Sequence, residues 1–532
     1  MTENAEQPFA HGQGAILRTY GLTISPPRWQ QRLLFAGLLL FCLLYGAACA
    51  IFVPYVIAPV ALPILVLAGL VIWALPGSRT PPVGTLERLF FIFLLVLVLW
   101  PNYLAITAPG LPWVTVLRLT GIPLMFVLLV CVSISGPFRA EVGAILEEVP
   151  ALWRFLVAFI AIQVVSVAFS AHKGDSIGKL LIAEYSWTTV FFTGCYILAK
   201  PKRAERWAAC MWLTTLPVCA IGLWQAKLHK LPWEGHIPSF LKVNDVAVAR
   251  VMAGAIRTGT DLYRIQATFT NSLGLADYLA VAAPFAVHFM VRPYNLAVRI
   301  LAGLTLPLIF VTIYLSHTRL GSVGLLIALL LYPLIWALRR WKSAPREVIP
   351  HFVMLAYPVV FAIGVAASFA VGKIRRILWG VGAETYSNQA RLDQYHSGFP
   401  KVLSHPWGYG IGEGAVELGY VTPSGLLTID TYYMRLALEY GVIGILVFYG
   451  ILLSGIGYGI RSILRAPEDD EQLLLIPACI ALVSCIVIQS VYGQDDNHPL
   501  MFMILALVAA LVWRTRQAER GLAHNRAGAV IR

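Results

Sequence analysis

The sequence is poor in charged residues. Only 13% of its 532 residues are Asp, Glu, Lys or Arg, whereas an ordinary soluble domain carries about 25%. Hydrophobic residues make up 58%, and the mean hydropathy is +0.74. The apolar residues fall in blocks of about twenty, which is long enough for a helix to cross a hydrocarbon core about 30 Å thick. This composition excludes a soluble protein and predicts a polytopic membrane protein.

Signals for disulfides, metals and nucleotides are also missing. The eight cysteines lie inside apolar blocks, without CxxC or Cys/His spacing in a loop, so neither a disulfide framework nor structural zinc is expected. No GxxxxGK[ST] loop is present, and the glycine-rich stretch 408–414 lacks the context of a dinucleotide site, so it is interpreted as a flexible turn. His396 and His405 have no partner at ligand spacing, and residues 495–498 are interpreted as a solvated turn. No cofactor or metal is expected.

Hydropathy windows of about nineteen residues predict an all-α transmembrane bundle with both termini on one side. Lys and Arg gather on that side, in the turns at 200–203, 339–342 and 461–465 and in both tails. By the positive-inside rule that side is the cytoplasm, so the net charge of +13 is assigned to topology and not to nucleic-acid binding. The fourteen expected spans lie near 33–53, 55–75, 88–107, 114–134, 151–170, 178–198, 207–226, 274–291, 296–315, 319–338, 350–372, 434–460, 473–491 and 499–513.

Two connections on the external side are far longer than the others, and connections of such length are commonly functional. The second one is too rich in aromatic residues and glycine for simple disorder, so it is expected to be partly helical and to fold over the membrane surface. The chain is accordingly divided into an N-terminal bundle, an external loop, spans with an arginine motif, a large external loop, and C-terminal spans with a cytoplasmic tail. These parts are 1–226, 227–273, 274–372, 373–433 and 434–532.

Ionisable side chains inside spans are costly, at roughly 2.5 to 3.5 kcal/mol each at mid-membrane, and they commonly mark function. Six of them lie within about two turns of the external ends of their spans. They predict a water-accessible cavity that faces the two long loops. The alternative is that individual charges only reach out to the interface. The six residues are Arg118, Glu184, Asp277, Arg319, Arg435 and Glu439.

Three motifs follow one another on the external side. An arginine followed by F-x-N enters a span at 264–279, a Ser-x-x-Arg motif opens the next outward-starting span at 315–322, and a His-Pro-x-Gly-x-Gly loop leads to an aromatic Glu-x-Gly helix start within 391–444. Together they resemble the O-antigen ligase and polymerase superfamily, which are polytopic glycosyltransferases acting on undecaprenyl-diphosphate-linked glycans. The resemblance covers about 250–460. It implies a GT-C-like fold in the bacterial inner membrane, with an active site facing the periplasm.

The resemblance implies roles that fit the residue types. Arg319 and Arg264 are candidates to bind the diphosphate, because guanidinium is always charged and can bind two phosphate oxygens at once, which requires no metal. Family ligases typically carry a His-Asn pair where this chain has Asp430-Thr431. A carboxylate can also accept a proton from a hydroxyl, so Asp430 is expected to activate the acceptor, with His405 as the alternative. The expected substrate-binding residues are Arg391, Asn271, Tyr432, Tyr433, Trp407 and Glu439.

Several alternatives stay open at this point. The external aromatic residues could bind sugar faces or simply anchor the protein at the membrane interface. The leading hypothesis is a polymerase that transfers a glycan from undecaprenyl diphosphate to another lipid-linked repeat unit. A ligase that transfers to lipid A-core or protein is the second, and a flippase or transporter of lipid-linked oligosaccharides is the third. The expected partners are the lipid-linked oligosaccharide and membrane lipids, with chain-length regulator and export proteins as candidates, and no nucleic acid.

Overall fold

A computed structural model describes residues 80–106, 114–243, 263–372, 385–422, 427–465 and 469–530, together with a few isolated positions. All of these ranges lie in the larger of two compact units, which comprises 64–108 and 112–532. The predicted spans near 33–53 and 55–75 lie wholly or mostly outside the described residues.

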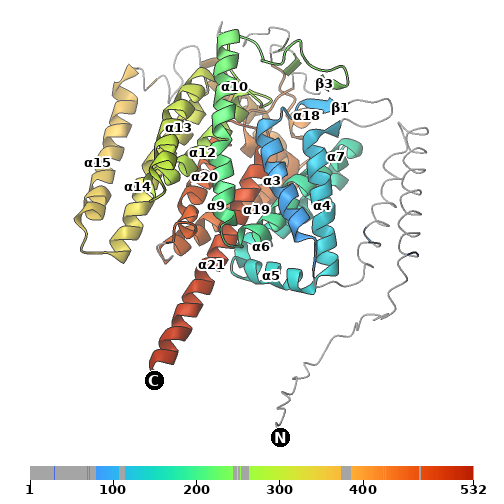
Figure 1. The fold of residues 1–532 in the computed structure, drawn as a ribbon. Helices are drawn as coiled ribbons and strands as arrows, with labels where there is room; N and C mark the ends of the chain where they lie inside the picture. Colours follow the sequence, from blue (N-terminus) through green and yellow to red (C-terminus); the bar gives the residue numbers. More distant parts are fainter. Residues whose placement is uncertain are drawn as a thin grey trace. The chain divides into compact units, whose positions relative to one another are not determined.

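The described part is built almost entirely of helices (Figure 1). Three short strands form an antiparallel sheet in the order β2-β1-β3, with Ala105 opposite both Thr115 and Lys242. The elements are α3 (Val83–Leu99), β1 (Leu104–Ile106), β2 (Val114–Thr115), α4 (Val116–Ile134), α5 (Gly136–Glu147), α6 (Pro150–Ser166), η1 (Val167–Phe169), α7 (Lys173–Ala183), η2 (Glu184–Thr188), α8 (Thr189–Leu198), α9 (Arg203–Leu213), α10 (Thr215–Leu228), β3 (Leu241–Val243), α12 (Ser272–Val291), α13 (Leu296–Leu315), α14 (Arg319–Ser343), α15 (Val348–Ala370), α17 (Thr385–Ser404), α18 (Gly414–Leu418), α19 (Tyr432–Ile463), η3 (Gln472–Leu474), α20 (Leu475–Ile488) and α21 (His498–Val530).

Nine helices among the described residues are long and apolar enough to cross a membrane, and 472–488 is a shorter apolar helix. The predicted all-α polytopic bundle is therefore confirmed. The expected span 88–107 is wrong at its end, because α3 stops at Leu99. The proline at 101 disfavours the helical conformation in the residue before it, and the chain continues into β1. Helix α5 was not predicted; Ser135 caps its start, and a proline occupies its first turn.

The long connections gather at one end of the bundle, which we name the loop face. It carries β1, β3 and α18, drawn near the top of Figure 1, whereas α5 and the C-terminus lie near the bottom. Since α13 runs towards this end, the turn at 316–318 and the first residues of α14 belong to the loop face. The basic segments 200–203 and 339–342 lie at the opposite end. That this opposite end is cytoplasmic stays a prediction.

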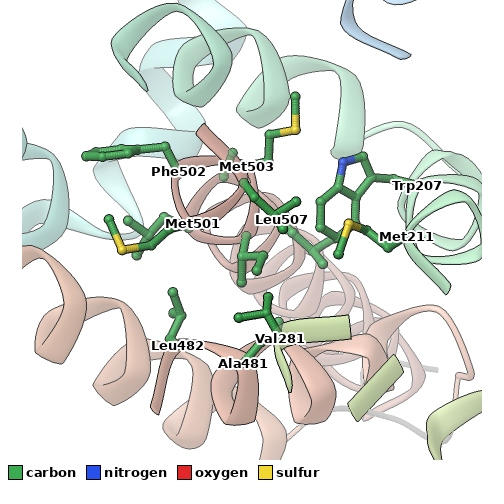
Figure 2. Close-up of a cluster of buried hydrophobic side chains, with 14 of the residues drawn as sticks. Trp207, Met211, Val281, Ala481, Leu482, Met501, Phe502, Met503 and Leu507 are labelled. Carbon is green, nitrogen blue, oxygen red and sulfur yellow. The ribbon is translucent and has the colours of Figure 1, made fainter. Parts of the chain in front are cut away.

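Helix α21 lies at the centre of the packing. Every residue from Leu500 to Val512 is buried, and α8, α19 and α20 pack around this stretch. Figure 2 shows Met501, Phe502, Met503 and Leu507 of α21 together with side chains of α9, α12 and α20. A helix that is apolar on all sides is stable only where other elements surround it, so α21 organises the helices that end at the loop face.

Helices α12 and α14 approach each other through small residues. A Cβ placed on Gly324 would lie 2.6 Å from Cβ of Ala280, and one on Gly321 would lie 2.7 Å from Cβ of Ala276. Small residues let helix backbones pack closely within a membrane. This contact holds the first turn of α14, which begins with Arg319, beside the start of α12.

We expect Gly324→Leu to destabilise the protein by about 1–3 kcal/mol, because the added side chain must push α14 away from α12. Thermal unfolding in detergent measures the change. Gly364→Leu is the matched control, since no atom lies within 4 Å of a Cβ at Gly364 on the exposed helix α15. Equal melting temperatures for the two variants would contradict the close contact.

Candidate functional site

Three arginines gather where α14 begins. Nη2 of Arg319 and Nη1 of Arg391 donate to the same Oδ1 of Asn388, at 3.1 and 3.3 Å. Nε and Nη2 of Arg264 donate to the backbone oxygens of Ser316 and His317, at 3.1 and 3.2 Å. The third guanidinium is therefore held on the turn that immediately precedes Arg319. We name Arg264, Arg319 and Arg391 the arginine group.

Helix α17 connects the arginine group to Asp430. Asn388, Arg391 and Gln394 are spaced three residues apart on one side of this helix. Oε1 of Gln394 accepts the backbone N–H of Asp430 at 2.9 Å, and Oγ1 of Thr428 lies 3.5 Å from Oδ1 of Asp430. Asp430 is half-buried, and the residue that caps α19 is Thr431, so the carboxylate of Asp430 is not used as that cap.

Helix α19 is broken at Gly441, and the glycine-rich loop fills the break. Gly441 has φ +66° and ψ −170°, and a Cβ on it would lie 2.0 Å from O of Pro406. The loop supplies the hydrogen bonds that the break removes: N–H of Tyr409 and Gly410 donate to O of Leu438 and Glu439 at 2.7 and 3.0 Å, and Val442 N–H donates to Pro406 O at 3.1 Å. The interpretation of 408–414 as a flexible turn was wrong. An interrupted helix requires its free backbone groups to be satisfied by protein.

A second charged group lies at the start of α19. Nε of Arg435 donates to Oε1 of Glu439 at 2.9 Å, and its Nη1 and Nη2 each lie 3.2 Å from an oxygen of Asp495. Burial opposes ionisation of Asp495, but Arg435 beside it holds its pKa well below the usual range. The interpretation of 495–498 as a solvated turn was therefore wrong for Asp495, which joins this turn to α19.

The same turn also binds the start of α12. Nδ2 of Asn497 donates to Oδ2 of Asp277 at 2.8 Å and to O of Gly274 at 2.9 Å. Asn271 caps α12 by accepting the N–H of Gly274 at 2.8 Å, and it also donates to Gln494. Asn271 thus has a clear structural role here. Asp277, Asn497 and His498 line a small cavity with Gln489, Tyr492, Cys485 and Met501.

Sequence reasoning missed a histidine–carboxylate pair at the loop face. Nδ1 of His172 lies 3.1 Å from both oxygens of Glu413, which also accepts Oγ–H of Ser170 at 2.7 Å and N–H of His172 at 2.8 Å. Oγ of Ser176 donates to O of Ile411 at 2.6 Å. These bonds attach the glycine-rich loop to the start of α7. His172 and Glu413 are 241 residues apart in the sequence, so no local pattern could have revealed their contact.

This pair predicts a pH-dependent contribution to stability. The hydrogen bond and charge of Glu413 raise the pKa of His172. Burial opposes ionisation of Glu413, but the donors of Ser170 and His172 lower its pKa. The Glu413 contribution is present above its unfolded pKa and lost in acid, and the His172 contribution is present below its unfolded pKa and lost as pH rises. Both are present between about pH 4.3 and 6.5.

We therefore expect His172→Gln to lower the melting temperature more near pH 5.5 than near pH 8.5. The first value is about one unit below the ordinary pKa of histidine and the second about two units above it, so they compare the charged with the neutral side chain. His396→Gln is the control, because His396 is an exposed histidine on α17. An equal loss at both pH values would show that charge on His172 does not stabilise the loop.

The other expected site residues are more dispersed. His405 is exposed at the far end of α17, about 20 Å along the helix from Arg391, and its ring lies 4.4 Å from that of Tyr409. Trp407 is 65% exposed. Tyr432 is buried against Phe448 and His498, and Tyr433 donates to O of Ile486 at 2.6 Å, so both belong to the helix packing.

The six charges predicted to share one external level fall into separate neighbourhoods. Arg319 binds Asn388, Asp277 binds Asn497, and Arg435 pairs with Glu439. Arg118 lies beside Tyr185 of η2, and Glu184 opens that π-helical turn. Asp277 and Arg435 are joined by the turn at 495–497, since Asn497 binds the first and Asp495 the second.

Within the described ranges, no group of three or more His, Cys, Asp or Glu residues could hold a metal ion. The cysteines of these ranges are free: Cys131, Cys195, Cys210, Cys219, Cys479 and Cys485.

Comparison with known proteins bears on the segment that contains most of this site. A family model described as O-antigen ligase matches residues 304–449. This segment is thus similar to the O-antigen ligase family. The match runs from α13 to the middle of α19, so it includes Arg319, Arg391 and Asp430, whereas Arg264 and Asp495 lie outside it. No curated protein matches the chain. The superfamily that the sequence motifs resemble is confirmed, and the match supports a function of the ligase or polymerase type in a multi-pass membrane protein.

Proposed function

We propose that this protein is a polysaccharide polymerase of the bacterial inner membrane. In this proposal, it transfers a glycan from undecaprenyl diphosphate to a hydroxyl of another lipid-linked repeat unit at the periplasmic face. The observation that carries the proposal is the arginine group at the loop face, two of whose members lie in the O-antigen ligase segment and bind one amide oxygen. The proposal keeps the division of the chain that the sequence predicts, with boundaries at 226/227, 273/274, 372/373 and 433/434.

The arginine group would bind the donor diphosphate. Nη2 of Arg319 and Nη1 of Arg391 lie within about 6 Å of each other, because both contact Oδ1 of Asn388. Arg264 is held at the preceding turn by two backbone oxygens. Guanidinium groups fixed in this way bind phosphate oxygens in defined geometry and stabilise the charge that develops on the leaving diphosphate. A diphosphate is a good leaving group, so the step requires no general acid.

Asp430 would activate the acceptor. It lies at Gln394, one helical turn along α17 from Arg391, which is a separation of about 5 Å along the helix axis. The acceptor hydroxyl attacks the anomeric carbon of the donor, and its proton passes to the Asp430 carboxylate while the bond to the diphosphate breaks. His405 is less suited to this role, because it lies near the opposite end of α17.

The polyprenyl tail would lie on the lipid-facing surface below the arginine group. Helices α13 and α15 expose large apolar side chains, among them Leu304, Phe310, Phe352, Leu355 and Phe361. Such a surface can accommodate a hydrocarbon chain while the diphosphate remains at the aqueous end.

A ligase is the second candidate, since the match to the O-antigen ligase model supports both functions. The Asp430-Thr431 sequence in place of a His-Asn pair favours the polymerase. A flippase is a weaker candidate, because transporters typically place ionisable groups near the membrane midplane, whereas the arginine group lies at one end of the bundle.

The test combines purified full-length protein with lipid-linked repeat units and resolves the products on a gel. We expect a ladder of lengthened glycans without any added acceptor. Transfer only after lipid A-core or an acceptor protein is supplied would instead identify a ligase. Absence of product under all three conditions would contradict both enzyme functions.

A further inference from the structure

Helix α17 exposes a narrow apolar stripe at the loop face. Leu392, Phe399 and Leu403 follow one another at spacings of seven and four residues, which places them within about 40° of one another around the helix axis. They are 48%, 58% and 79% exposed, and Trp407, which follows shortly after the helix ends, is 65% exposed. We name these four residues the α17 stripe. Helix α17 is not among the apolar helices of the described ranges that could cross a membrane, so a transmembrane position does not explain the stripe.

Another side of α17 is packed against the protein. Gly398 and Val402 are buried on this side. A Cβ on Gly398 would lie 2.5 Å from Sδ of Met434 and 3.3 Å from Cδ1 of Leu418, and Val402 belongs to the same buried cluster as these two residues. The helix therefore lies against α18 and the start of α19, and the α17 stripe faces a different direction.

The remaining side of α17 is exposed and polar. Asp393, Ser397 and Ser404 lie on it, about 100–140° around the helix axis from the stripe, and the exposed His396 lies between the two. The helix thus has one packed, one apolar and one polar side. This arrangement is typical of a helix at the edge of a membrane protein that contacts lipid on its apolar side and water on its polar side.

Both ends of α17 are attached to the loop-face ends of spans. Near its start, Asn388 accepts a hydrogen bond from Arg319, the first residue of α14. After its end, O of Pro406 accepts the N–H of Val442 at 3.1 Å. Because α19 is broken just before Val442, the remaining residues 442–463 form a segment of about 33 Å, which by itself crosses a hydrocarbon core of about 30 Å. Val442 therefore lies at the boundary of that core, and α17 runs along the membrane surface.

The α17 stripe is also continuous with a lipid-facing surface. The second part of α19 exposes large apolar side chains on one side, namely Val442, Ile443, Leu446 and Leu453. Trp407 stands beside the loop-face end of this surface, because Pro406 bonds to Val442 and a Cβ on Gly441 would lie 2.8 Å from the carbonyl carbon of Trp407. The apolar surface of the span thus extends onto α17.

We propose that the α17 stripe inserts into the membrane leaflet at the loop face and binds the acyl chains of its lipids. Interfacial helices bury their apolar side about 5–10 Å into the boundary between headgroups and acyl chains, and the indole of Trp407 suits that boundary. Arg391 directly precedes Leu392, so this insertion holds Arg391 near the level of the lipid phosphates. That consequence bears on the proposed function, whereas the lipid contact itself does not rest on it.

The test is photocrosslinking in the full-length protein. Benzoylphenylalanine is incorporated at one position at a time, on the stripe at Phe399 or Leu403, and on the polar side at Asp393 or Ser397 as matched controls. Each protein is placed in nanodiscs of palmitoyl-oleoyl phosphatidylcholine and irradiated, and intact-mass spectrometry gives the fraction that carries one lipid. Incorporation at Leu446, which is 67% exposed on the span α19, provides the yield expected of full lipid contact.

We expect adduct yields at Phe399 and Leu403 to be within about twofold of the yield at Leu446 and at least about fivefold above those at the polar positions, because the apolar side of an interfacial helix lies below the headgroups. All these positions are exposed, so the melting temperatures should match the wild type. Equal lipid yields on the two sides of α17, or no lipid adduct on the stripe, would overturn the proposal. A protein–protein adduct from the stripe would also overturn it, in favour of a contact between two copies of this chain.

Discussion

Arg319→Ala is expected to lower the rate of glycan transfer by about 10²–10³-fold, which is the usual effect of removing one donor that stabilises transition-state charge. Arg319 is the member of the arginine group that is held between the turn of Arg264 and helix α17. Arg319→Lys should recover only part of the rate, because an ammonium cannot bind two phosphate oxygens in fixed geometry. The initial rate of ladder formation from lipid-linked repeats measures both effects.

The control for this experiment is Arg299→Ala. Nε of Arg299 donates to O of Met290 at 3.1 Å near the start of α13, at the end of the bundle opposite the loop face. This variant should transfer glycan at the wild-type rate. In cells, Arg319→Ala should reach the normal membrane level and accumulate short lipid-linked repeats. A wild-type rate for Arg319→Ala would remove the main support for the proposed function.

Gly441→Ala is expected to prevent accumulation of folded protein. Its φ and ψ lie in a region that is essentially restricted to glycine, and the new Cβ would lie 2.0 Å from O of Pro406. The loop would have to withdraw from α19, which would leave O of Leu438 and O of Glu439 without their donors. We expect a loss of more than about 3 kcal/mol, which combines backbone strain with two unsatisfied groups. Yield of monodisperse protein and its melting temperature are the measurements.

Gly457→Ala is the control within the same helix. No atom lies within 4 Å of a Cβ at this position, and alanine is favoured over glycine in a helix by about 0.5–1 kcal/mol. This variant should therefore be as stable as the wild type or more so. If Gly441→Ala folded equally well, the glycine-rich loop would not be inserted into α19 as described.

The local motifs drew attention to candidate residues but not to their environments. Arg319 and Arg391 were chosen because they belong to motifs of the resembled superfamily, and their role stays a prediction. Asn388 accepts a hydrogen bond from each of them. It lies in a polar part of α17, where no sequence pattern distinguishes it from its neighbours. Gln394 was missed for the same reason, although it binds Asp430.

Burial was the property that the sequence predicted least well at the loop face. Tyr432 and Tyr433 were candidates to bind sugars or to anchor the protein; Tyr432 is buried among the helices, and Tyr433 is half-buried and donates to O of Ile486.

The sequence by itself determined that the chain is a polytopic helical membrane protein with the motifs of one superfamily. Hydropathy over twenty residues and short motifs are local properties of the sequence, so they can be recognised without knowledge of the fold. Tertiary structure decided which charges pair, that the glycine-rich loop completes a broken helix, and that Asn388 joins Arg319 and Arg391 beside the turn that holds Arg264. These contacts join segments that are far apart in the chain, such as Glu413 with His172 and Arg435 with Asp495. They arise from how the helices pack, and a periodic pattern does not encode that packing.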